Sequence, residues 1–407
     1  MTIIHTSDWH LGRRLYGRRR YAEFSAFLDW LSGEIERQEA DALLVAGDVF
    51  DSASPGNRDQ ELYYRFLFRV AESACRHVVI IAGNHDSASF LEAPKDLLKA
   101  LNIHVVASAC SAIEDEVLTL QDECGEPELL VCAVPYLRER DVRQVEAGES
   151  LDDKERKYCE GIQRHYEVVT AFAEKRRETL GRDIPIVVMG HLFAAGGKTL
   201  ADDGVRELYV GSLAHVSGAI FPDSLDYVAL GHLHVPQTVR NSERLRYSGS
   251  PLPVGFGEAG QEKSVCVVSL GPEGTVVSAL PIPVFQELER IRGDWESIDA
   301  RIRALAGVNA TAWLEVLYEG EEIIPDLRER LDAAIAGTGL EILRISNNRL
   351  VEGMLGQEHA GESLSDLDVH DVFARCLADY QIPEEQRQPL LRAYGETLES
   401  LFDESSG

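Results

Sequence analysis

The sequence predicts an α/β fold whose strands carry polar residues to one edge of a sheet. Short apolar runs, which indicate buried strands, alternate with amphipathic helical segments over the first hundred residues. Five such runs along the chain end at Asp, Asn or His, and four of them do so through a glycine. Because the carboxyl ends of parallel strands form the ligand-binding edge of open α/β sheets, we expect these side chains to converge at one edge of one sheet.

The first part of the chain has the strand–helix alternation of a parallel sheet. The helical segments keep apolar residues at near-helical spacing, as Phe24, Phe27, Leu31 and Ile35 do. The predicted elements are a strand at 3–6, a helix at 21–38, a strand at 43–46, a helix at 58–74, a strand at 78–82 and a helix at 90–101.

The middle of the chain is richer in strands. A long charged helix at 152–180 interrupts them, and Pro281-Ile282-Pro283 ends the pattern, so we place the first domain boundary there. The predicted strands lie at 117–120, 129–134, 186–189, 207–210, 227–230, 244–247, 264–270 and 275–280.

The remaining chain divides into three parts. Residues 284–349 indicate a small α+β unit with helices at 295–305 and 325–335 and strands at 313–318 and 340–345. A linker at 350–362 precedes an acidic helical hairpin at 363–407. The apolar stripes of this hairpin suit packing on its own protein or docking on a partner, and periodicity leaves both open.

The composition is that of a globular protein. Apolar residues make up 44% of the chain and charged residues 27%. No apolar run approaches the ~20 residues that cross a bilayer, and Met1 leads into a strand without the regions of a signal peptide. The seven cysteines are scattered without a Cys-x-x-Cys pair, which favours reduced thiols. We therefore expect a cytoplasmic protein with no membrane association.

The net charge of −29 argues against an extended DNA-binding face, because phosphate binding normally needs a basic surface. Part of the excess lies in residues 351–407, which contain 13 acidic and 3 basic residues. Basic charge gathers instead directly after His10. This segment is a solvated loop or a phosphate contact, and the nearby metal-type residues favour phosphate contact by Arg13, Arg14, Arg18, Arg19 and Arg20.

The polar residues at the strand ends have the chemistry of metal ligands. Each alone has a common structural explanation, as a turn former or a hydrogen-bonded histidine. Their joint recurrence favours a shared site. Oxygen and nitrogen donors without a thiolate suit Mn, Fe, Zn or Mg, and seven donors suit two ions that clamp a phosphoryl group and acidify water. The predicted ligands are Asp8, His10, Asp48, Asn84, His191, His232 and His234.

One histidine of the set is not needed as a ligand. His85 adjoins Asn84 and, placed over the site, would protonate the departing oxygen as general acid. Asp86 would orient this histidine or stabilise its charge. The predicted catalytic residues are therefore His85 and Asp86.

At these residues the chain resembles the calcineurin-like metallophosphoesterases. Their five motifs are similar to Asp8-x-His10, Gly47-Asp48-x-x-Asp51, Gly83-Asn84-His85-Asp86, Gly190-His191 and Gly231-His232-x-His234. The resemblance narrows to the SbcD family, the nuclease subunits of bacterial SbcC–SbcD DNA-repair complexes. It covers essentially the whole chain and is strongest at residues 5–12, 46–51, 82–87, 229–232 and 247–251.

The resemblance implies a fold and a ligand arrangement. The fold would be a metallophosphoesterase β-sandwich flanked by helices at 1–283, a capping domain at 284–349 and C-terminal helices. One manganese ion would be held by Asp8, His10, Asp48 and His234, and the other by Asp48, Asn84, His191 and His232. Mg²⁺, Fe²⁺ or Zn²⁺ would suit the same donors.

The resemblance also implies an activity and partners. The family acts as a Mn²⁺-dependent exonuclease on double-stranded DNA ends and as an endonuclease at hairpins. It works with SbcC, a coiled-coil ATPase, as a homodimer within a heterotetramer, and the terminal helices would bind SbcC. The ligand set equally suits a phosphoesterase for cyclic nucleotides or phosphomonoesters. A scaffold without activity is a third interpretation, which the intact ligand set disfavours.

Overall fold

The structure is a computed structural model that describes residues 1–143, 149–195, 216–320 and 326–347, with the single residues 322, 324 and 394. These residues fall into two compact units, residues 1–290 with 311–314, and residues 291–310 with 315 onward. The strand predicted at 207–210, the linker and the C-terminal hairpin lie outside the described residues, apart from Tyr394. The domain boundary at residue 283 stays a prediction.

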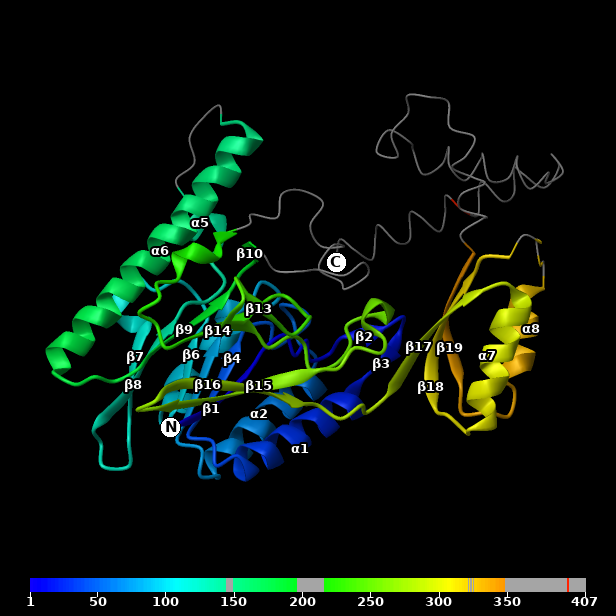
Figure 1. Cartoon of the computed structure of the whole chain (residues 1–407), viewed down its shortest axis with the longest axis horizontal. Helices are drawn as coiled ribbons and strands as arrows, with labels where there is room; N and C mark the ends of the chain where they lie inside the picture. The colour runs from blue at the N-terminus through cyan, green and yellow to red at the C-terminus, as the bar shows by residue number, and fades with distance from the viewer. Residues whose placement is uncertain are drawn as a thin grey trace. The chain divides into compact units, whose positions relative to one another are not determined.

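The first unit contains two six-stranded sheets (Figure 1). In the first sheet the four strands from β1 to β6 run parallel, and the last two strands of the unit join antiparallel to β1. Across the sheet the order is β16 (Gly274–Pro281), β15 (Ser264–Gly271), β1 (Thr2–Thr6), β4 (Ala42–Ala46), β5 (His77–Ile81) and β6 (Ile103–Val106).

The second sheet has a parallel centre of four strands and an antiparallel strand at each edge. Its order is β13 (Gln237–Val239), β14 (Ser242–Tyr247), β12 (Tyr227–Gly231), β9 (Ile186–His191), β8 (Pro127–Ala133) and β7 (Val117–Gln121). The expectation of one sheet edge is therefore wrong, because β9 and β12 belong to a different sheet from β1, β4 and β5.

The two sheets pack face to face, which confirms the β-sandwich. In β4, Leu43 and Val45 point into a core shared with helices, while Leu44 and Ala46 point into the core between the sheets. A strand buried on both faces is apolar at every position. Helices α1 (Tyr21–Arg37) and α2 (Asn57–Ala71) cover the first sheet, and α6 (Leu151–Leu180) covers the second (Figure 1).

The connections differ from the predictions in two places. The helix expected at 90–101 is two short helices, α3 (Ala88–Glu92) and α4 (Lys95–Lys99), separated at Pro94, which lacks the amide that a continuous helix needs. Strand β6 was not expected. The other short elements are β2 (Arg14–Leu15), β3 (Arg18–Arg19), α5 (Glu139–Val142), β10 (Ala194–Ala195) and β11 (Val216–Ser217).

The second unit is a small α+β structure, as the sequence predicts. Its helices are α7 (Trp295–Gly307), capped by the Asp294 side chain, and α8 (Leu327–Ile335). A three-stranded sheet runs in the order β17 (Glu287–Gly293), β18 (Ala312–Tyr318) and β19 (Glu341–Asn347), and both β17 and β18 belong partly to the first unit. Strand β17 was not expected.

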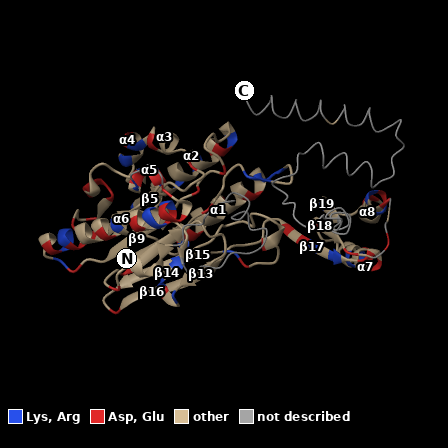
Figure 2. Ribbon diagram, turned by 90° about the horizontal axis from the view of Figure 1, so that it is seen from above, with Lys and Arg blue, Asp and Glu red and all other residues tan. Residues whose placement is uncertain are grey.

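Two further features concern the helices. The exposed face of α6 carries both charge signs along its length (Figure 2), with Arg156 paired to Asp153 and Glu160. Such exposed pairs contribute little to stability. Among the residues that the structure describes, no helix has both the length and the apolar composition needed to span a bilayer.

Candidate metal centre

The predicted ligands come together where strand ends of the two sheets meet. His191 ends β9, and its Nδ1 donates to the carbonyl of Ala46 at the end of β4, with a distance of 2.9 Å. Gly231 ends β12, and a side chain there would overlap the same carbonyl oxygen. Glycine therefore allows the second sheet to approach the first closely at this point.

The backbone is in the left-handed region at several ligand positions. Residues other than glycine adopt this region uncommonly, and it costs of order 1–3 kcal/mol each. Its recurrence at tight turns after strands aims the side chains at a common space. The four positions are Asp8 (φ 53°), His10 (φ 48°), Asp48 (φ 51°) and His232 (φ 102°).

A first group of donors contains Asp8, His10 and His234, whose candidate ligand atoms all lie within 4.8 Å of one another. The Nε2 atoms of the two imidazoles are 3.2 Å apart. The Asp8 carboxylate is held by the backbone amide of His232 at 2.9 Å and the Ser7 hydroxyl at 2.5 Å. All three side chains are buried.

A second group is centred on Asp48. Its Oδ2 lies 3.3 Å from His191 Nε2 and 3.7 Å from His10 Nε2, which is a position between the two groups of donors. Asn84 Oδ1 lies 3.0 Å from His191 Nε2 and 3.1 Å from His232 Nδ1. The structure thus brings all seven predicted ligands together.

The hydrogen bonds around His191 fit a bound cation. Because Nδ1 donates to Ala46, a neutral His191 ring presents the lone pair of Nε2 to the oxygens of Asp48 and Asn84. A cation satisfies three such acceptors at once. Although burial lowers it, the pKa of His191 is raised to about 9 by the carboxylate of Asp48, which likewise indicates a site that attracts positive charge.

Burial has a different effect on the other imidazole of the second group. Burial, reinforced by the nearby His191 imidazole, lowers the pKa of His232 to about 3. A ring that stays neutral keeps a lone pair available for a metal. The pKa of Asp48 is opposed by burial but held well below its usual range by His191 and His10. The set therefore combines an ionised carboxylate with a neutral imidazole.

His85 lies at the rim of the cluster and is only partly buried. Its Nδ1 donates to the carbonyl of Asp51 at 2.9 Å, and its backbone amide donates to Asp48 Oδ1 at 2.9 Å. The His85 and His10 rings meet edge to face at 4.9 Å. A third group of close donors consists of His10, Asp51 and His85, so the geometry permits His85 to act either as a free acid or as a ligand.

Asp86 does not have the predicted contact with His85. Its carboxylate accepts backbone amides from Val49 at 3.1 Å, Phe50 at 2.9 Å and Gly83 at 2.9 Å. Burial raises the pKa of Asp86 to about 6. Within the described chain, Asp86 ties the loop after β4 to the loop after β5, and the carbonyl of Asp51 orients His85 instead.

The arginine segment forms a hairpin of β2 and β3, and its five arginines differ. Arg20 is 3% exposed, forms a two-bond ion pair with Glu23 and donates to the carbonyl of Pro253, so it is a structural residue. Arg13 is paired with Asp51 at 3.1 Å. Arg14, Arg18 and Arg19 are exposed. The prediction of phosphate contact therefore applies to these three and not to Arg20.

Sequence reasoning gave no role to several residues that contact the ligands. Asp51 Oδ1 lies 3.4 Å from His10 Nδ1, and the spacing Gly47-Asp48-x-x-Asp51 was the available signal. Glu258 Oε1 lies 3.5 Å from His234 Nδ1, and it follows no pattern in the sequence. The Ser248 hydroxyl lies 2.8 Å from Ser7, which explains one residue of the segment at 247–251.

Comparison with known proteins agrees with this geometry. Residues 1–236 match the family described as calcineurin-like phosphoesterase, and the fold and site are those of this class. Residues 284–381 match a second family, described as type 5 capsule protein repressor C-terminal domain. The chain belongs to the SbcD family, one of the two components of the SbcCD nuclease, and it is a metal-dependent nuclease.

Three relatives support this membership. The SbcD component of the SbcCD nuclease of Escherichia coli K12 is 36% identical over 408 residues, which cover 99% of each chain. The SbcD protein of Rhodobacter capsulatus is 34% identical over 70% of this chain and 69% of its own. That of Bacillus subtilis is 34% identical over 67% of each chain.

Proposed function

We propose that this nuclease hydrolyses double-stranded DNA by a two-metal mechanism with Mn²⁺, as an exonuclease at ends and an endonuclease at hairpins. The observation that supports it most is the position of the Asp48 carboxylate, between His10 on one side and His191 on the other. A carboxylate shared between two groups of donors suits a pair of ions better than a single ion.

The ligands divide into two sets that share Asp48. Asp8, His10 and His234 complete one set, and Asn84, His191 and His232 complete the other. Bound divalent cations would supply charge stabilisation for the phosphoryl oxygens and a more acidic water. Mixed carboxylate, amide and imidazole donors suit Mn²⁺, and Mg²⁺, Fe²⁺ or Zn²⁺ would suit them as well.

His85 is the general acid of this proposal. Its Nδ1 donates to the carbonyl of Asp51, so only Nε2 is available to transfer a proton to the departing oxygen. This hydrogen bond fixes the ring against the loop after β4. Asp86 acts on the same loop through its backbone amides, and it therefore positions Asp48 rather than His85.

The substrate and partners follow from the family. The relatives carry the name of one component of SbcCD, and we propose that this chain likewise works with the ATPase SbcC, through its residues 363–407, as a homodimer within a heterotetramer in the cytoplasm. Residues 284–349 would shape DNA access as a capping domain. Arg14, Arg18 and Arg19, with Arg13, would contact backbone phosphates beside the cluster.

The decisive experiment compares substrates with one preparation of the full chain. Cleavage of linear and hairpin duplex DNA is measured with Mn²⁺, with EDTA, and with SbcC and ATP. A cyclic nucleotide and a phosphomonoester are tested under the same conditions. Mn²⁺-dependent cleavage of the duplexes supports the proposal. Turnover of the small substrates alone would replace it with a small-substrate phosphoesterase.

A further inference from the structure

A buried ion pair lies directly behind the predicted metal ligand His234. Glu258 is 0% exposed and Lys263 is 4% exposed, and their charged atoms are 2.5 Å apart. Burying two charges is costly and often contributes no net stability compared with apolar residues of the same volume. The pair therefore needs an explanation besides stability, and its contacts with His234 provide one.

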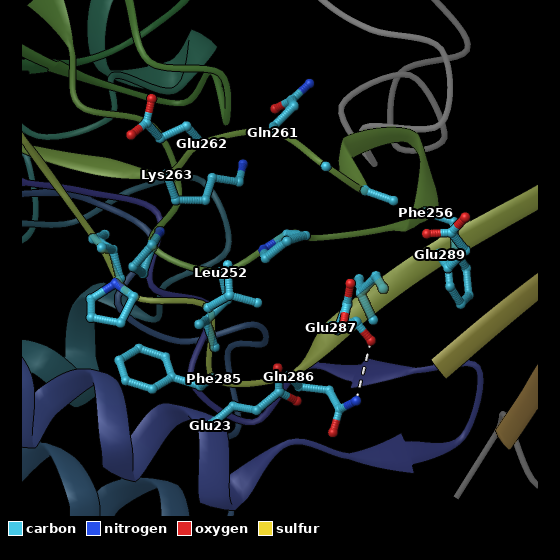
Figure 3. Close-up of a pocket in the computed structure, with 18 of the residues that line it drawn as sticks. Glu23, Leu252, Phe256, Gln261, Glu262, Lys263, Phe285, Gln286, Glu287 and Glu289 are labelled. Carbon is cyan, nitrogen blue, oxygen red and sulfur yellow. Dashed lines mark hydrogen bonds between the residues drawn. The ribbon is translucent and has the colours of Figure 1, made fainter. Parts of the chain in front are cut away.

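Lys263 holds the backbone of the ligand. Its Nζ donates to the carbonyl of His234 at 3.0 Å and to the hydroxyl of Ser250 at 3.1 Å. The amide of Ser250 donates to the same carbonyl at 3.0 Å. Lys263 also lines a hollow of about 960 Å³ beside Leu252 and Phe256 (Figure 3). The ammonium group thus fixes the main chain at His234 from the side away from the metal cluster.

Glu258 faces the ring of the same residue. Its Oε2 accepts from Lys263 and from the amide of Val254 at 3.0 Å, while its Oε1 lies 3.5 Å from His234 Nδ1. Oε1 is buried and makes no hydrogen bond within the described residues. The opposite ring atom, His234 Nε2, lies 3.2 Å from His10 Nε2 in the metal cluster. The carboxylate and the cluster therefore contact opposite edges of one imidazole.

We propose that Glu258 and Lys263 are positioning residues that hold His234 with its Nδ1 protonated and its Nε2 directed at the metal. A histidine ligand is commonly fixed in this way by a carboxylate at its second nitrogen, and loss of such a partner typically weakens metal binding 10–100-fold. This inference rests on the proposed metal site, since it gives His234 the role of a ligand.

The other histidine of the same set has a comparable neighbour. His10 Nδ1 lies 3.4 Å from Asp51 Oδ1. Asp51 is 29% exposed and is also paired with Arg13, whereas Glu258 is shielded from solvent. Each imidazole of this set thus has a carboxylate on the edge away from the cluster. The arrangement at Glu258 is the more rigid of the two, because Lys263 and Val254 both bind its second oxygen.

The variant Glu258→Gln tests the proposal through the orientation of its amide. Lys263 and Val254 are both donors, so the amide oxygen will turn toward them and the amide NH₂ toward His234 Nδ1. That orientation favours the tautomer with the proton on Nε2, which cannot bind a metal. The double variant Glu258→Leu/Lys263→Met removes both charges together and guards against unfolding caused by an unpaired lysine.

A matched control is present elsewhere in the first unit. Glu116 is 0% exposed and lies 2.7 Å from His165 Nε2, and it also accepts the amide of Cys110 at 2.7 Å. Glu116→Gln therefore disturbs a buried carboxylate–imidazole pair that has no predicted metal ligand. It reports how much any such change lowers stability without altering metal binding.

The experiment measures Mn²⁺ stoichiometry and dissociation constants of the full chain by calorimetry, with urea unfolding in EDTA as a separate measure of folding. We expect two ions in the wild type, a 10–100-fold weaker site in both Glu258 variants, and wild-type binding in Glu116→Gln. Wild-type affinity in a folded Glu258 variant would overturn the inference. A wild-type chain that binds fewer than two ions would instead overturn the two-metal proposal, and the inference with it.

Discussion

Gly83 lies so close to Asp48 that a methyl group on its α-carbon would overlap the carboxylate oxygen Oδ1 and the backbone amide of that residue. The absence of a side chain at the end of β5 therefore sets the position of the carboxylate at the centre of the cluster. Asp86 binds the amide of Gly83 and two amides of the loop that carries Asp48, so the two loops are fastened together at this contact.

The substitution Gly83→Ala should displace Asp48. A misplacement of about 1 Å in a catalytic group costs on the order of 10²-fold in rate, and we expect a loss of at least that size in duplex cleavage, together with weaker Mn²⁺ binding. The control Gly33→Ala lies in α1 with open space around it and should be stabilising by roughly 0.5–1 kcal/mol. Full activity of Gly83→Ala would show that the carboxylate need not be fixed.

The substitution His85→Ala separates the two roles that the geometry allows for this residue. As a general acid, His85 should contribute about 10²–10⁴-fold to cleavage, and its removal should leave two bound Mn²⁺ ions per chain. Metal content by elemental analysis and single-turnover cleavage measure the two effects on one sample. Loss of an ion would make His85 a ligand of the group formed with His10 and Asp51.

The strand ends of the site were predictable from local sequence, but their division between sheets was not. Apolar runs that end in Gly-Asp or Gly-Asn mark the ends of β4 and β5 without reference to the rest of the chain. A run buried on both faces has no periodicity that shows which sheet it joins. Consequently β9 and β12 were expected beside β4, whereas they form the facing layer.

The residues behind the ligands were not predictable for a related reason. Glu258 lies in a short turn at 256–258, where an acidic residue is normally exposed, and its burial depends on Lys263 folding back from β15. Arg20 has the same character: it belongs to a basic segment in the sequence, yet it is buried against Glu23. Such pairings depend on tertiary contacts that the local pattern does not contain.

The two faces of the arginine hairpin give opposite expectations. Arg18→Ala/Arg19→Ala removes exposed charge, so it should reduce the salt dependence of DNA binding by about 2 in slope and leave stability within about 0.5 kcal/mol. Arg20→Ala leaves Glu23 buried without its partner and should cost about 3–5 kcal/mol of stability. Fluorescence anisotropy across a salt series and urea unfolding measure the two effects. An unchanged slope in the double variant would exclude the hairpin from the phosphate contact.

The interior of the sandwich should make the protein sensitive to acid through His5. This residue of β1 is 0% exposed, and its Nδ1 lies 2.8 Å from the hydroxyl of Tyr227 on β12, so it joins the two sheets. Burial lowers its pKa to about 3, and the guanidinium of Arg246 acts in the same direction. The folded protein thus keeps His5 neutral at pH values where the unfolded chain, with a pKa of about 6.5, binds a proton.

The sign of the effect follows from proton binding. Between pH 6.5 and about 3 the unfolded state binds more protons at this position, so stability is fully present above pH 6.5 and falls as the pH decreases. One such group contributes a slope of at most about 1.4 kcal/mol per pH unit. Urea unfolding in EDTA at several pH values should show a shallower slope for His5→Asn, which cannot titrate. Equal slopes in the two proteins would assign the acid sensitivity to other groups.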